Sequence, residues 1–118
     1  MSELLNQWKY EVKTHLPELL AELAYSIKQL HPDCAVILFG SYARGEQNDD
    51  SDLDICVLLP ELTHGRTGMT ADIYGVIRRD FPLPVDVLLY TCDEFEQRAK
   101  KKSGMPYKIK NEGVVLNN

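Results

Sequence analysis

The sequence predicts a single domain of the α/β class, in which helices flank a small mixed sheet of three or more strands. Three short apolar runs, at residues 34–39, 53–59 and 85–90, are rich in β-branched residues and are typical of buried strands. Apolar residues recur at helical spacing before, between and after these runs. A chain of 118 residues is within the usual size of one domain.

Two helices are expected before the first strand. Leu5, Trp8 and Val12 share one helical face and predict a helix over residues 3–13, which Pro17 separates from the next segment. A stronger apolar pattern then predicts a helix over 16–30 that ends before Pro32. The strand at 34–39 follows directly.

The connection between the first two strands, residues 40–50, is rich in turn-forming residues and has room for one short helical turn. This connection is too short for a helical crossover of the usual length. The strands at 34–39 and 53–59 are therefore expected to be antiparallel.

Residues 61–68 are expected to form a loop. Thr70 is a suitable cap for a helix whose apolar face carries Ile73, Ile77 and Phe81, and Pro82 ends this helix. The third strand, residues 85–90, comes next.

Two more helices are expected after the third strand. Thr91 and Glu94 have the spacing of a capping box, which predicts a helix that continues to Lys102. Ser103 is a candidate cap for a short last helix, and Gly113 is expected to end it.

Composition excludes several classes of protein. The net charge of −5 argues against direct nucleic-acid binding and against attraction to anionic membranes. No apolar run approaches 18 residues, and the N-terminus has no signal-peptide core. The three cysteines lack metal-ligand spacing and are expected to be free thiols. The three histidines are scattered and are expected on the surface. A cytoplasmic protein is the expectation.

The stretch LFGSYARGEQNDDSDLDICVLL, residues 38–59, combines a glycine-rich turn with aspartates at alternate positions. A P-loop is excluded, because Glu46 and Gln47 stand where Lys and Ser or Thr are required. An EF-hand fits Asp50, Asp52 and Asp54 at its first ligand positions, but Ile55 replaces the glycine that its sharp turn needs.

A magnesium site fits the whole stretch better. Asp52 and Asp54 are two residues apart on a strand, so their carboxylates point to the same face. Gly40 and Ser41 can bring backbone N–H groups and a hydroxyl against a phosphate. Asp86, in the third apolar run, is a third candidate ligand. Three aspartates facing a polyphosphate suit a site for two Mg²⁺ ions.

These residues resemble the signature of the polymerase-β-like nucleotidyltransferases: GSYARG, then SDLD, then an aspartate on a later strand. The short length resembles the minimal nucleotidyltransferases (MNT), which implies one such domain over 1–118. The resemblance implies that Gly40 and Ser41 hold the triphosphate of ATP and that Asp52 and Asp54 bind both Mg²⁺ ions. It also implies that Asp86 completes the metal site beside the acceptor hydroxyl.

The resemblance further implies a partner. Many minimal nucleotidyltransferases are antitoxins of a HEPN-domain toxin, and some transfer AMP from ATP to a tyrosine of that toxin. The expected function is therefore a protein adenylyltransferase in a toxin–antitoxin system. The alternative is a catalytically silent nucleotide-binding module that neutralises its partner by contact.

Simpler interpretations of the same residues stay open. The three aspartates could face water, and Ser41 could merely cap a helical turn. Arg44 is a candidate for nucleotide binding or for an ion pair with Asp49 or Asp50. The basic cluster Arg98 and Lys100–Lys102 is interpreted as a solvated helix end.

Overall fold

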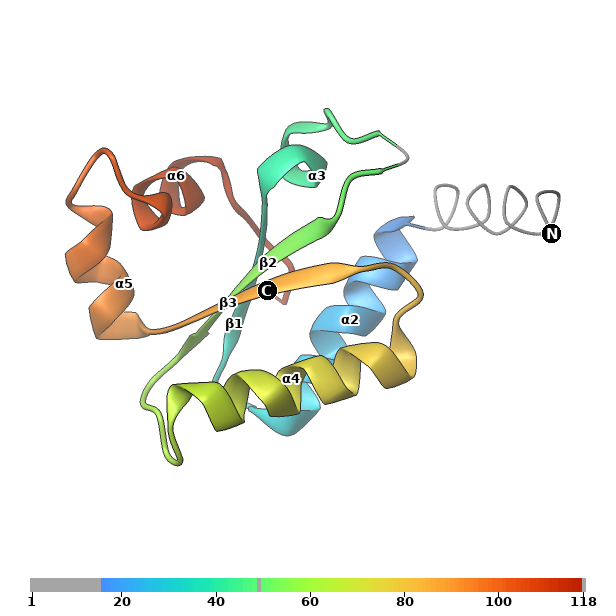
Figure 1. Cartoon of the computed structure of the whole chain (residues 1–118), viewed down its shortest axis with the longest axis horizontal. Coiled ribbons are helices and arrows are strands. Elements are labelled where there is room, and N and C mark those ends of the chain that lie inside the picture. The colour runs from blue at the N-terminus through green and yellow to red at the C-terminus, as the bar shows by residue number, and fades with distance from the viewer. Residues whose placement is uncertain (1–15, 49, 118) are drawn as a thin grey trace, which may run out of the picture.

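The computed structural model describes residues 16–48 and 50–117 (Figure 1). These residues form five helices and four strands, which confirms the predicted α/β class; the helix expected over 3–13 lies outside them. In chain order the elements are α2 (Leu16–Leu30), β1 (Ala35–Phe39), α3 (Gly40–Arg44), β2 (Leu53–Leu59), α4 (Arg66–Asp80), β3 (Val85–Thr91), α5 (Cys92–Ala99), α6 (Met105–Glu112) and β4 (Val114–Val115). Among the described residues, no helix has the length and apolar character needed to span a membrane.

The strands form one mixed sheet in the order β3-β2-β1-β4. β1 pairs antiparallel with β2, as the short connection predicts, and antiparallel with β4. β2 pairs in parallel with β3, and α4 lies in the crossover connection between them. The end of β1 and the starts of β2 and β3 therefore meet at one edge of the sheet.

The sheet is covered on both faces. α2 and α4 pack on one face through Leu23, Ile27 and Ile73, which join the larger apolar core (Figure 1). α5 and α6 pack on the other face through Phe95 and Ile109, which form a smaller core. Because side chains alternate along a strand, odd-numbered residues of β2 enter the larger core and even-numbered residues face α5 and α6.

The start of α4 differs from the prediction. The helix begins at Arg66, and Thr70 lies inside it, so Thr70 is not its cap. Gly65 precedes the helix without a side-chain cap. The extra turn is held by tertiary contacts instead, because Met69 is buried and Arg66 donates hydrogen bonds to the Leu89 carbonyl and to Glu94.

The boundaries of the last two helices also differ from the prediction. The capping box of Thr91 and Glu94 is confirmed, but α5 ends at Ala99 and does not continue to Lys102. Lys101 and Gly104 lie in turns that separate the helices. The cap of α6 is Gly104, and the expected cap Ser103 lies before it.

The fourth strand was not predicted. β4 has only two residues, which pair with Ile37 and Leu38 of β1. Gly113 ends α6 as predicted, but its backbone is extended, so it is not a left-handed cap. Glycine is needed there because a Cβ would overlap the Ile109 carbonyl and the Ile37 side chain. After β4, the Asn117 side chain holds the chain against β1.

Candidate active site

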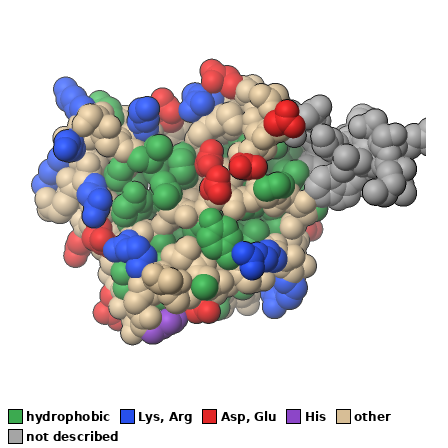
Figure 2. Space-filling view, viewed as in Figure 1, with side chains coloured by type: hydrophobic (Ala, Val, Ile, Leu, Met, Phe, Trp, Pro, Cys, Tyr) green, Lys and Arg blue, Asp and Glu red, His purple; other side chains and the backbone are tan. Residues whose placement is uncertain are grey.

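The register of the sheet brings the predicted aspartates together. Asp54, the second residue of β2, pairs with Phe39 of β1 on one side and with Asp86 of β3 on the other. Residues that pair directly point to the same face of a sheet, so Asp54 and Asp86 project side by side. Asp52 lies immediately before β2 and two residues before Asp54. Figure 2 shows acidic side chains gathered over β2 and β3, next to a hydrophobic patch.

Asp54 is the least exposed of the three aspartates. Partial burial raises its pKa, and the negative charges of Asp86 and Asp52 raise it further. Arg44 acts in the opposite direction. The site thus concentrates negative charge, which a bound cation would relieve.

Gly40 allows the backbone to lie against the Asp54 carboxylate. Its φ of +74° is in the left-handed region that favours glycine, and a Cβ at this position would overlap the Asp54 side chain. Gly40 and Ser41 begin α3, which confirms the short helical turn in this connection. The structure therefore places Gly40 beside Asp54, and Ser41 follows it as the second residue of α3.

Arg44 has ion-pair partners other than the predicted ones. Its guanidinium contacts Glu46 at 2.9 Å and Glu112 of α6 at 3.5 Å. Asp49 lies outside the described residues, and the Asp50 backbone N–H donates a hydrogen bond to the side-chain oxygen of Asn48. Arg44 therefore links the glycine-rich turn to α6.

The donor set fits magnesium that is shared with a phosphate ligand. Within residues 16–48 and 50–117, no group of three His, Cys, Asp or Glu side chains could hold a metal ion by itself. Mg²⁺ is usually held by one or two carboxylates together with water and substrate phosphates. Asp52 and Asp54, with Asp86 alongside, offer this kind of incomplete oxygen site.

A cavity of about 200 Å³ opens beside Asp54. The end of β1 and α3 line one side, and Met105, Lys108, Ile109 and Glu112 of α6 line the other. None of these α6 residues was predicted as a site residue, because no sequence motif links α6 to a strand some fifty residues earlier.

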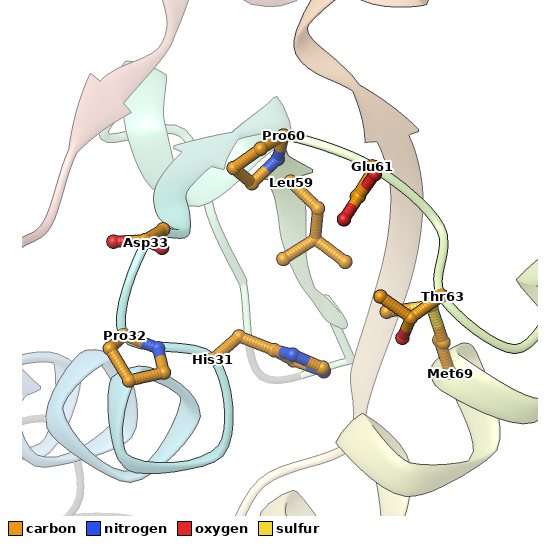
Figure 3. A pocket seen from close by; sticks show the side chains of 8 residues that line it. All are labelled: His31, Pro32, Asp33, Leu59, Pro60, Glu61, Thr63 and Met69. Carbon is orange, nitrogen blue, oxygen red and sulfur yellow. The ribbon is translucent and has the colours of Figure 1, made fainter.

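A second cavity, of about 190 Å³, lies at the opposite end of β2, around Leu59 and Pro60 (Figure 3). The ring of His31 points into it, beside Thr63 and Met69. The His31 Nε2 atom is buried and has no hydrogen-bond partner among the described residues, so the expectation of a surface histidine is wrong here. His64 is exposed, as expected. No predicted site residue lines this cavity.

Comparisons with known proteins identify relatives of this chain. A protein of Methanocaldococcus jannaschii named "putative protein adenylyltransferase" is 29% identical over 75 residues, which cover 64% of this chain and 75% of that protein. A second protein of the same organism and name is 33% identical over 60 residues, 51% of this chain and 48% of that protein. This chain thus matches about half the length of the second relative.

The fold and the family are also shown by comparison. The crystal structure described as a "putative nucleotidyltransferase" from Sulfolobus solfataricus has a TM-score of 0.59 and 20% identity. The superposition covers 91% of this chain and 84% of that chain, a likeness that shows the fold. The model of the nucleotidyltransferase domain family matches residues 20–112, most of the chain. The chain therefore belongs to the nucleotidyltransferase domain family.

Proposed function

We propose that this protein is a magnesium-dependent adenylyltransferase that transfers AMP from ATP to a hydroxyl group of a partner protein. The observation that carries the proposal is the alignment of Asp54 with Asp86 across β2 and β3, with Asp52 and the backbone of Gly40 beside Asp54. The names of the two Methanocaldococcus jannaschii relatives support a protein acceptor.

Each residue of the site has a proposed role. The Gly40 backbone and the Ser41 hydroxyl donate hydrogen bonds to the phosphates of ATP. Asp52 and Asp54 hold magnesium together with the phosphate oxygens of ATP, and Asp86 is the third protein ligand. Magnesium, when bound, supplies positive charge that offsets the charge developing on the phosphates during transfer. Arg44 is proposed to contact the nucleotide in addition to its ion pairs.

The reaction is a substitution at the α-phosphorus of ATP. The acceptor oxygen forms a bond to this phosphorus, the bond to the bridging oxygen breaks, and pyrophosphate leaves. Asp86 is proposed to lie next to the acceptor hydroxyl, where its carboxylate orients the O–H group and accepts its proton. Its exposed position on the outer strand β3 leaves room for a protein acceptor.

The acceptor is proposed to be a tyrosine of a HEPN-domain toxin, for which this chain acts as antitoxin. The support is the resemblance of GSYARG and SDLD to minimal nucleotidyltransferases. We place the reaction in the cytoplasm, where ATP and Mg²⁺ are supplied.

A labelling experiment tests this function. The purified protein is incubated with Mg²⁺ and the protein encoded by the adjacent gene, with ATP labelled at either the α- or the γ-phosphate. Label from the α-phosphate should enter the partner, whereas label from the γ-phosphate should not. The matched control is Asp72→Asn, which alters an exposed carboxylate of α4 outside the site.

Two other outcomes are informative. Neutralisation of the partner without labelling would support the silent binding module and contradict the transferase. Transfer of the γ-label would indicate a kinase reaction and would also contradict the proposal.

A further inference from the structure

We propose that the cavity between α6 and the start of β2 binds the nucleobase of the nucleoside triphosphate, with Met105 as its principal contact. The inference rests on the proposed transferase function and identifies the part of the donor that this cavity accepts.

The position of the cavity supports this assignment. Gly40 and Asp54 form part of its lining, and these residues are the proposed contacts of the phosphates and of magnesium. A group that occupies the cavity is therefore next to the triphosphate. Asp86 is on the other side of Asp54, toward β3, so the cavity is separate from the proposed position of the acceptor.

The chemistry of the lining favours a base over a phosphate. Phe39, Met105 and Ile109 provide an apolar wall. The two cations of the lining, Arg44 and Lys108, are balanced by Asp54 and Glu112, and Arg44 is already paired with Glu112. A polyanion requires an excess of positive charge, whereas a flat, uncharged ring is matched by an apolar wall with a few polar groups at its rim.

The volume of the cavity suits one part of a nucleotide and not the whole molecule. Its volume is about 200 Å³, smaller than the ~300–1,000 Å³ of pockets that enclose whole drug-sized ligands. A nucleobase is the apolar part of ATP, and the ribose and phosphates then extend toward Gly40.

Met105 is well placed for this contact. It is the first residue of α6, lines the cavity, and is 46% exposed, so its side chain is accessible to a ligand. The buried Pro106 follows it and restricts the backbone at the start of the helix. A flexible methionine thioether makes favourable contacts with aromatic rings, and a bound base would cover the apolar surface that Met105 leaves exposed.

The methionine methyl groups allow a direct test. The chain has three methionines, so labelling them with ¹³C gives few signals, and Met105→Ala identifies the one from Met105. With Mg²⁺ and ATP, ring currents of the base should shift the Met105 signal; with Mg²⁺ and inorganic tripolyphosphate, they should not. Met69 is 1% exposed in the core on the opposite face of the sheet and is the internal control.

Affinities provide the second readout, measured by calorimetry in Mg²⁺. Met105→Ala should weaken ATP binding about tenfold, because the apolar contact with the base is lost, and should leave tripolyphosphate binding unchanged. Tyr25→Ala, which removes a 67% exposed aromatic ring from α2, should change neither affinity. Met105→Leu, which keeps an apolar side chain of similar volume, should retain most of the affinity for ATP.

The outcomes separate this inference from the function on which it rests. If the wild-type protein binds ATP and Met105→Ala binds it equally well, or if both ligands shift the Met105 signal alike, the base assignment is wrong. If the wild-type protein binds neither ATP nor tripolyphosphate in Mg²⁺, the transferase proposal fails and the inference fails with it.

Discussion

Asp54 and Asp86 pair with each other across two strands but have different surroundings. Asp54 is partly buried on the central strand β2, and Gly40 lies against it. Asp86 is exposed on the outer strand β3. This difference predicts that the two residues contribute to different steps, Asp54 to binding of the metal and nucleotide and Asp86 to transfer.

Asp86→Asn is therefore expected to slow AMP transfer by at least about a hundredfold while most of the ATP–Mg²⁺ affinity remains, since positioning and metal electrostatics supply most of the rate in such reactions. Asp52→Asn and Asp54→Asn should weaken binding and transfer together. Single-turnover rates and calorimetry on folded variants measure both effects, with Asp72→Asn as control. Unchanged transfer in Asp86→Asn would remove this residue from the site.

The charge on Asp54 should also cost stability when no metal is bound. Burial and the neighbouring carboxylates raise its pKa from the ordinary value of 3.8, so the free energy of unfolding falls as the pH rises through this range. In EDTA at pH 7, Asp54→Asn should raise the melting temperature by a few degrees. The gain should disappear near pH 3, where Asp54 is largely protonated in both states. A lower melting temperature at pH 7 would contradict this prediction.

The helix α4 shields backbone groups of the outer strand β3 from pairing with another chain. The Tyr74 hydroxyl accepts a hydrogen bond from the Val87 N–H group at 2.9 Å, and Arg66 donates one to the Leu89 carbonyl. Unpaired backbone groups on an edge strand can pair with another chain, so these side chains reduce that hazard. Arg66 also contacts Glu94, which joins α4 to the start of α5.

Glu94 should make stability depend on pH. The hydrogen bond from Arg66, followed by the one from the Thr91 backbone, lowers the pKa of Glu94 to about 2 from 4.5. A lowered pKa gives stability that is fully present above the unfolded value and is lost as the pH falls through about 2. Glu94→Gln should therefore lower the melting temperature at pH 7, and the difference should shrink below pH 4.5 and vanish near pH 2.

Thermal unfolding across this pH range measures the effect of Glu94. Glu96→Gln, on the exposed face of the same helix, is the control and should behave like the wild-type protein throughout. A deficit of Glu94→Gln that stayed constant from pH 7 to about pH 2 would mean that the ion pair is not its cause.

Ligand binding should stabilise the fold as a whole. The site joins the end of β1, the start of β2 and β3, and α3, so a ligand there bridges segments that separate on unfolding. ATP at a hundred times its dissociation constant should add about 2.7 kcal/mol to the free energy of unfolding in Mg²⁺. EDTA should abolish the increase in melting temperature. An equal increase in EDTA would argue against magnesium between Asp52, Asp54 and the phosphates.

Most helices and strands were predictable because each depends on contacts within its own segment. The apolar run of β2 and the helical spacing of α2 are local patterns, and the capping box of Thr91 and Glu94 spans four residues. The start of α4 was missed because its first turn is held by Arg66 through Leu89 and Glu94, which are distant in the sequence. β4 was missed because two valines carry no readable alternation.

The same distinction applies to the site. Spacing along one strand and one turn was enough to predict that Asp52 and Asp54 share a face and follow Gly40 and Ser41. The pairing of Asp86 with Asp54, and the position of Met105 and Glu112 of α6 along the adjacent cavity, came from the packed fold. The cause is register: the pairing of β2 with β3 and the packing of α6 depend on the burial of side chains from the entire sheet, which no local pattern encodes.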